Sequence, residues 1–92
     1  MNFIYEENRI YLNNEDNVVV AEIRFPEVEG NTVEITRTFV DESLRGQGVA
    51  GKLMNEAVTS LKEKGKKVIP TCSYARKWFE NHEEYKSMVA EK

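Results

Sequence analysis

The first forty residues alternate between apolar and polar positions, which is the pattern of half-buried β-strands. In the clearest run the polar residues Glu22 and Arg24 lie on one side, and every second residue is apolar. These apolar positions are Val19, Ala21, Ile23 and Phe25. Polar clusters separate the runs, and short connections of this kind favour antiparallel neighbours. We therefore predict four strands, over residues 3–5, 9–12, 18–25 and 32–40.

After residue 45 the period changes to that of an α-helix. Apolar residues recur at intervals of three and four along one face: Ala50, Leu53, Met54, Ala57, Val58 and Leu61. Gly65 suits the end of this helix, and residues 67–70 predict a short strand. Ser73 can cap a second helix, in which Trp78 and Phe79 are expected to lie in the core.

The predicted order is ββββ-α-β-α in a single domain, residues 1–92. This is an α/β (α+β) fold with two helices and a mixed, mainly antiparallel sheet. A right-handed crossover would set the last strand parallel to the strand that precedes the first helix.

Charge and composition exclude several classes of function. The chain has 92 residues, with 13 Lys and Arg against 16 Asp and Glu, and its net charge of −3 disfavours a nucleic-acid partner. The longest aliphatic run, residues 18–21, predicts neither a membrane span nor a secretory signal. With one cysteine and one histidine, we expect no internal disulfide and no metal site, in a reducing cytoplasm.

The most informative segment is residues 45–52, which read Arg-Gly-Gln-Gly-Val-Ala-Gly-Lys and open the first helix. Glycines let successive backbone N–H groups converge on one point, and the helix N-terminus adds partial positive charge. The segment is therefore suited to a phosphate or pyrophosphate. A plain strand-to-helix connection is the alternative, but three glycines within six residues exceed what such a turn needs.

Two phosphate-binding patterns match these letters but not their context. Gly46, Gly48 and Gly51 fit the dinucleotide pattern G-x-G-x-x-G, but the preceding strand ends near Val40 and no acidic residue closes the next strand. The P-loop pattern also fits as far as Lys52. At the next position the pattern requires a magnesium-binding hydroxyl, and this chain has Leu53 there.

A third pattern, R-x-x-G-x-A, is formed by Arg45, Gly48 and Ala50. The segment 38–53 around it resembles motif A of the GNAT-type N-acetyltransferases. The Pro-Thr-Cys-Ser-Tyr segment at residues 70–74 resembles a narrower group of short, stand-alone, YjdJ-type acetyltransferases. The resemblance covers nearly the whole chain and implies a minimal acyl-CoA N-acyltransferase-like fold that uses acetyl-CoA as the acetyl donor.

The resemblance also implies a binding role for each matched residue. The pyrophosphate of acetyl-CoA would be held, mostly through backbone N–H groups, by Arg45, Gly46, Gln47, Gly48, Val49 and Ala50. Phe39 and Val40 would offer backbone groups to pantetheine and to the thioester carbonyl. Two departures stand out: Asp41 replaces a proline common in the family, and the chain lacks the N-terminal helices that build an acceptor pocket in larger members. The acceptor amine therefore stays unidentified.

Cys72 and Tyr74 are the candidate catalytic residues. Cys72 follows the second parallel strand, where it either takes the acetyl group covalently or lines the site while the amine attacks directly. Tyr74 is a candidate proton donor to the departing thiolate, with a strand-end aromatic as the alternative. His82 is a weaker candidate base because it also suits a helix C-terminus, and Glu34 could reach an amine through water.

The leading hypothesis is a cytoplasmic, acetyl-CoA-dependent N-acetyltransferase that acts on an unidentified amine. Two other classes stay open: a non-catalytic acyl-CoA or CoA-binding module that uses the same turn, and a small interaction protein that pairs a sheet edge with a partner. The expected partners are acetyl-CoA and an amine acceptor, with neither nucleic acid nor membrane. The oligomeric state stays open, and a monomer is compatible with the sequence.

Overall fold

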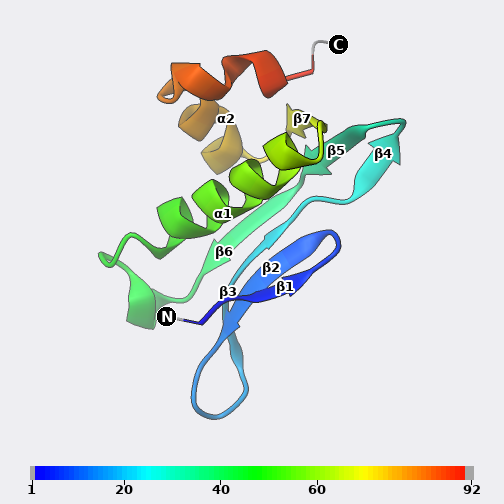
Figure 1. Cartoon of the computed structure of the whole chain (residues 1–92). Coiled ribbons are helices and arrows are strands. Elements are labelled where there is room, and N and C mark those ends of the chain that lie inside the picture. The colour runs from blue at the N-terminus through cyan, green and yellow to red at the C-terminus, as the bar shows by residue number, and fades with distance from the viewer. Residues whose placement is uncertain (1, 91–92) are drawn as a thin grey trace.

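The computed structural model describes residues 2–90 (Figure 1). Six strands come first: β1 (Ile4–Glu6), β2 (Arg9–Asn13), β3 (Val19–Arg24), β4 (Glu27–Glu29), β5 (Thr32–Ile35) and β6 (Arg37–Val40). They are followed by a 3-10 helix η1 (Glu42–Leu44), α1 (Val49–Glu63), β7 (Lys67–Pro70), α2 (Ser73–Glu80) and a second 3-10 helix η2 (Glu83–Met88). The mixed α+β fold with its mainly antiparallel strands is as predicted.

The strands form two sheets rather than one. The first sheet has the order β1-β2-β3-β6 and is antiparallel throughout. The second has the order β4-β5-β7, in which β7 runs parallel to β5. The predicted turn over residues 26–31 contains the short strand β4, so six strands rather than four precede α1.

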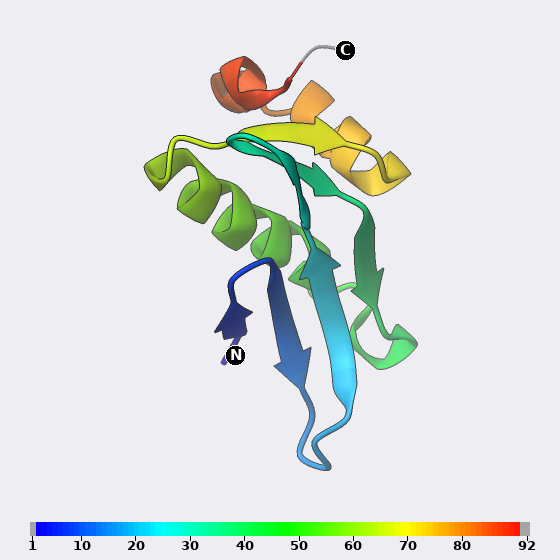
Figure 2. The ribbon, with the colours of Figure 1, turned by 90° about the vertical axis from the view of Figure 1, so that its right-hand side faces the viewer.

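The prediction of one continuous strand over residues 32–40 is wrong, because this run divides at Thr36. The backbone N–H groups of Thr71 and Cys72 both donate to the carbonyl of Ile35, at 3.1 Å each, and hold this half to β7. The N–H of Thr36 instead donates to the carbonyl of Arg24, at 3.1 Å, and β6 continues beside β3. Only β5 is therefore parallel to β7, and β6 turns away from it (Figure 2).

The core lies between α1 and the strands that it contacts, β2, β3 and β6. The helix buries Val49, Leu53, Met54, Ala57, Val58 and Leu61. Val49 is only 2% exposed whereas Ala50 is half-buried, so the apolar face begins one residue earlier than its period predicts. The second helix packs on β7 and buries Ala75, Trp78 and Phe79, as expected.

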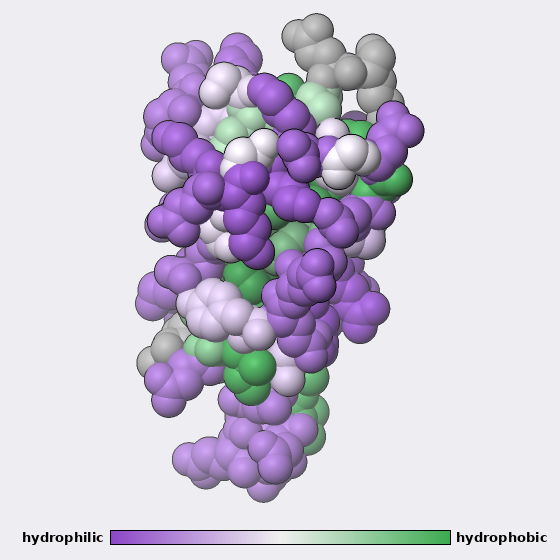
Figure 3. All heavy atoms as spheres, turned by 45° about the vertical axis from the view of Figure 1, so that its right-hand side comes forward, coloured by the Kyte–Doolittle hydropathy of each residue, from purple (hydrophilic) through white to green (hydrophobic). Residues whose placement is uncertain are grey.

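The other face of the first sheet carries polar and aromatic side chains. Ile10, Ala21 and Ile23 point to the core, so alternation turns their neighbours outward. The outward side chains are Arg9, Tyr11, Glu22, Arg24, Arg37 and Phe39. Figure 3 shows hydrophilic side chains over most of the side of the molecule in view, with apolar side chains in small patches.

Candidate functional site

The turn over residues 41–50 is organised by its own backbone. The Asp41 carboxylate accepts hydrogen bonds from the Ser43 hydroxyl at 2.7 Å and from its N–H at 3.0 Å, and so caps η1. These two bonds, the hydroxyl bond first, lower the pKa of Asp41. The N–H of Arg45 donates to Glu42 and that of Gln47 to Leu44, at 3.1 and 3.3 Å. The aspartate at the position common for proline therefore serves as a cap.

Residues 45–50 are called here the glycine turn. The N–H groups of Arg45 and Gln47 are paired within the turn, whereas among the described residues those of Gly46, Gly48, Val49 and Ala50 have no hydrogen-bond partner. Gly46 and Gly48 have φ of 84° and 71°, a left-handed conformation that favours glycine. Gly48 caps α1 without any side-chain hydrogen bond, so the first N–H groups of the helix keep no partner within it. Nothing lies within 4 Å of where a Cβ would sit on Gly46 or Gly48. The turn is therefore open to an anion, at the positive end of a fifteen-residue helix.

The side chains around this turn differ in what they can offer. Arg45 and Gln47 are exposed, so their side chains can reach a ligand. The side chain of Val49 is buried in the core and Ala50 is half-buried, so these two residues can contribute only backbone N–H groups.

Cys72 lies beside β6, and Tyr74 lies beside the first turn of α1. Cys72 caps α2, where its Sγ accepts the N–H of Ala75 at 3.4 Å and lies 3.6 Å from the Oγ1 of Thr38 on β6. The Oη of Tyr74 lies 3.8 Å from where a Cβ on Gly51 would sit, in the first turn of α1. Burial raises the pKa of Tyr74 and keeps its phenol protonated. The thiol therefore faces β6, and the phenol faces the first turn of α1.

The structure places His82 away from the candidate site and Glu34 beside it. The His82 ring stacks on Trp78 with centroids 3.8 Å apart, and its Nδ1 lies 2.7 Å from the Trp78 carbonyl oxygen beyond the end of α2. The Glu34 carboxylate accepts a hydrogen bond from the Thr71 hydroxyl, next to Cys72 in sequence. Glu34 thus lies beside the candidate site, whereas His82 belongs to an aromatic cluster.

In β6 the backbone N–H groups of Phe39 and Val40 point in opposite directions. The N–H of Asp41 donates to the carbonyl of Val20 at 2.8 Å, and Phe39 pairs with Glu22. Hydrogen-bonding positions recur at every second residue of an antiparallel ladder, so the N–H of Phe39 points to β3. The N–H of Val40 then points to the open edge of β6, which ends its sheet. This geometry favours Val40 as the donor to a bound carbonyl.

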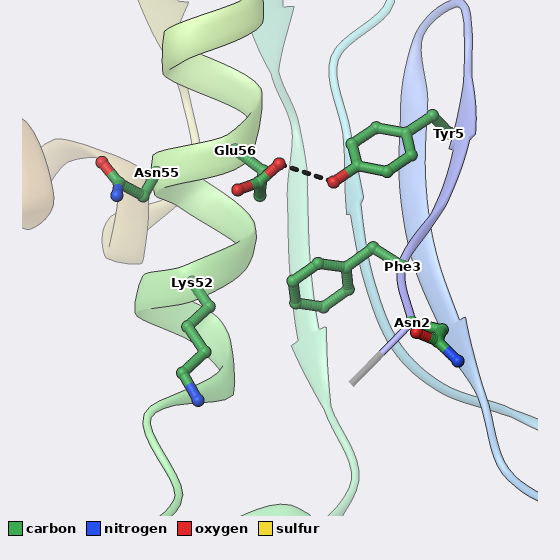
Figure 4. Close-up of a pocket in the computed structure, with 6 residues that line it drawn as sticks. All are labelled: Asn2, Phe3, Tyr5, Lys52, Asn55 and Glu56. Carbon is green, nitrogen blue, oxygen red and sulfur yellow. Dashed lines mark hydrogen bonds between the residues drawn. The ribbon is translucent and has the colours of Figure 1, made fainter.

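A separate pocket of about 450 Å³ lies between β1 and α1 (Figure 4). It is lined by Asn2, Phe3, Tyr5, Lys52, Asn55 and Glu56. The Tyr5 hydroxyl donates to the Glu56 carboxylate at 2.5 Å, and Lys52 points toward the N-terminal end of the helix. The pocket therefore adds a cation near the glycine turn but holds neither of the candidate catalytic residues.

Sequence reasoning missed the three arginines on the outer face of the first sheet. Arg9, Arg24 and Arg37 surround Glu22, which is 5% exposed. The alternation placed Glu22 and Arg24 on one side of their strand, but the register that adds Arg9 and Arg37 had no signal in the sequence.

Among residues 2–90, no helix is long and apolar enough to cross a membrane. In the same range, no group of three or more His, Cys, Asp or Glu side chains could hold a metal ion.

The fold and the turn define a class of protein. A helix with an open N-terminal turn, beside two strands that part into different sheets, is the architecture of the acyl-CoA N-acyltransferase-like fold. The family model of the GCN5-related N-acetyltransferases matches residues 9–88. The chain therefore belongs to this family.

Solved structures agree with this assignment. A GCN5-like protein from Staphylococcus aureus, solved by NMR, is 31% identical with a TM-score of 0.81, covering 99% of this chain and 89% of that one. YhbS from Escherichia coli, a GNAT-family N-acetyltransferase solved in complex with CoA, is 28% identical with a TM-score of 0.55, over 66% of this chain and 38% of that one. No curated protein matches the chain significantly.

One more distant solved structure shows a likeness of fold alone. The ribosomal-protein-S18-alanine N-acetyltransferase of Escherichia coli is 15% identical with a TM-score of 0.61, over 84% of this chain and 53% of that one. The chain thus spans about half the length of that enzyme.

Proposed function

We propose that this protein is an acetyl-CoA-dependent N-acetyltransferase that transfers the acetyl group to a small amine. The observation that carries the proposal is the unpaired N–H groups of the glycine turn at the N-terminus of α1. The region between β6 and β7 where Cys72 faces Thr38 is called here the gap. Family membership and the CoA complex of YhbS support the use of an acyl-CoA donor.

The donor substrate would lie along this gap. Its pyrophosphate would accept hydrogen bonds from the glycine turn, with the exposed side chains of Arg45 and Gln47 beside it. Its pantetheine arm would follow the open edge of β6, where backbone groups can bind an amide as a further strand would. The thioester carbonyl would meet the N–H of Val40. One such donor contributes on the order of 3 kcal/mol to stabilising the oxyanion of the transition state.

The acetyl group can pass to the amine by two routes. In direct transfer the unprotonated amine attacks the carbonyl carbon, the new C–N bond replaces the C–S bond, and Tyr74 gives its proton to the departing thiolate. The amide nitrogen then loses its extra proton through water, which restores the Tyr74 phenol. In the covalent route the Cys72 thiol loses its proton as its sulfur attacks the carbonyl carbon, and CoA leaves as a thiol that carries this proton. The amine then displaces Cys72 from the acetyl group, and the proton that the amine loses restores the Cys72 thiol. In either route the Sγ of Cys72 lies at the N-terminus of α2, where it accepts the N–H of Ala75 at 3.4 Å.

Two measurements test the proposal. Acetyl-CoA added to the isotope-labelled chain should shift the amide signals of residues 45–50 and Val40, and shifts confined to other residues would refute the assigned site. Thiol release from acetyl-CoA should then depend on an amine, tested with polyamines, amino acids and lysine peptides. Binding without turnover would support the alternative, a non-catalytic CoA-binding module.

Acid quenching followed by mass spectrometry separates the two routes. An acetyl adduct that forms on the native chain and disappears in Cys72→Ala supports the covalent route. A Cys72→Ala variant with native activity removes it.

A further inference from the structure

Three arginines form a row across the outer face of the first sheet. Arg9 of β2 pairs directly with Arg24 of β3, and Arg24 pairs with Arg37 of β6. Like charges directly opposite each other destabilise a sheet. A row that breaks this local rule is expected where the charges have a function. These residues are called here the arginine row.

A single buried carboxylate holds the row together. The Oε1 of Glu22 accepts the Nε–H of Arg9 at 2.7 Å, and its Oε2 accepts that of Arg37 at 3.0 Å. The same Oε2 forms an ion pair with the Nε of Arg24 at 3.2 Å. Burial alone would raise the pKa of Glu22, but the hydrogen bonds from the three arginines outweigh it and lower that pKa. Glu22 therefore stays ionised and positions the row.

The outer ends of the guanidinium groups are left for another partner. Arg24 and Arg37 bind Glu22 through Nε, and their side chains are 55% exposed. Aromatic rings support two members of the row: the guanidinium of Arg9 lies 3.8 Å from the Tyr11 ring centroid, and that of Arg37 lies 5.2 Å from the Phe39 centroid. Guanidinium groups oriented in this way offer paired N–H donors that match an oxyanion.

A hollow of about 580 Å³ adjoins the row. It is lined by Glu6, Asn8, Arg9, Arg24, Pro26 and Thr36. Its volume lies within the range of small-molecule sites. Thr36 lies between β5, which pairs with β7, and β6, which pairs with β3. The hollow therefore reaches the point at which the two sheets part. A ligand in this hollow would therefore lie beside Thr36, the residue after Ile35, whose carbonyl accepts the N–H of Cys72.

We propose that the arginine row binds the carboxylate of a small amine, such as an amino acid, and orients its amino group toward the gap between β6 and β7. The role of this ligand as acetyl acceptor rests on the proposed function, whereas its binding does not. Three guanidinium groups face two carboxylates, those of Glu22 and Glu6, which leaves one positive charge in excess. One further carboxylate would neutralise this charge. A polyanion would require a larger excess of positive charge, and the chain carries −3.

The test uses the full native chain and product-like probes, without acetyl-CoA. N-acetyl-L-alanine carries the carboxylate and N-acetyl-L-alaninamide lacks it. The acid should shift the side-chain Nε–H signals of Arg9, Arg24 and Arg37, and the amide should not. Each of Arg24→Gln and Arg37→Gln should weaken binding of the acid on the order of tenfold. Lys64→Gln, which removes one exposed cation at the end of α1, should leave it unchanged.

Several results would overturn the proposal: equal binding of acid and amide, unchanged binding in both arginine variants, or tighter binding of inorganic phosphate at the same residues. The comparison of acid with amide on the native chain needs no variant, so it stands even where a variant folds poorly. If acetyl-CoA fails to bind while N-acetyl-L-alanine still shifts the arginine row, the proposed function fails and the carboxylate site stands. With turnover, alanine should have a lower KM than alaninamide, and Arg24→Gln should raise the KM of alanine alone.

Discussion

The glycine turn and the arginine row both suit anions, but they are built from different materials. The glycine turn uses backbone N–H groups, which two glycines with positive φ leave unpaired at the end of α1. The arginine row uses three full charges on long side chains, which one buried carboxylate holds in place. The first depends on the conformation of a few consecutive residues, and the second depends on the register of three strands.

This difference determines how each region can be damaged. A backbone change at one residue can close the glycine turn without altering any charge. The arginine row responds to the loss of a single charged group, because one carboxylate neutralises several neighbours. The two regions can therefore be disabled one at a time, and the following predictions exploit this.

The largest effect is expected from Gly48→Val. The left-handed φ of 71° is strained for a β-branched residue, so the turn must rearrange and its N–H groups lose their common direction. Acetyl-CoA binding, measured by calorimetry, should become undetectable at concentrations that saturate the native chain. Binding of N-acetyl-L-alanine should persist, and loss of both together would argue that the chain had unfolded.

Tyr74→Phe should separate binding of the donor from the chemical step. Removing a general acid lowers kcat by on the order of a hundredfold, whereas the phenyl ring keeps nearly the same side-chain volume. Acetyl-CoA affinity should not change. Because burial raises the pKa of Tyr74, the native enzyme should lose kcat only at strongly alkaline pH, as the phenol deprotonates. An unchanged kcat in the variant would exclude Tyr74 as the proton donor.

Glu22→Gln should damage the arginine row and spare the glycine turn. Losing hydrogen bonds between charged groups should lower the free energy of unfolding by about 1–3 kcal/mol at neutral pH, and the half-exposed arginines place the effect toward the lower end. The native pKa of Glu22 is lowered, so its contribution is present above the unfolded pKa and is lost as pH falls through the folded one.

Urea unfolding at neutral and acidic pH measures this prediction. The native chain should lose more stability than Glu22→Gln on acidification. Added salt should reduce the difference between their free energies of unfolding at neutral pH. Equal acid sensitivity of the two proteins would show that Glu22 does not couple the row to folding.

The smallest effect is expected from Gly51→Ala. The added Cβ would lie 3.8 Å from the Tyr74 hydroxyl, an ordinary contact, and φ at this position is helical. Replacing glycine within the helix should raise the free energy of unfolding by about 0.5–1 kcal/mol and leave acetyl-CoA affinity unchanged. A loss of affinity would mean that the first turn of α1 must move when the ligand binds.

The sequence by itself determined most of the elements and the residues of the glycine turn. Periods of two and of 3.6 residues reflect backbone geometry within a segment, so the strands around Ile10 and Ile23 could be predicted, as could the helix whose apolar face was expected from Ala50. The positive φ at Gly46 and Gly48 is likewise a local property, and the residues of the turn could be named before the fold was known.

Only the tertiary structure decided where the run 32–40 divides and which arginines meet. The run divides at Thr36 because its first half pairs with β7 and its second half pairs with β3, and both partners are distant in sequence. Alternation gives the face to which Arg9, Arg24 and Arg37 point, but not the register that sets them side by side. Register is fixed by packing between strands, and this non-local choice leaves no periodic signal in the chain.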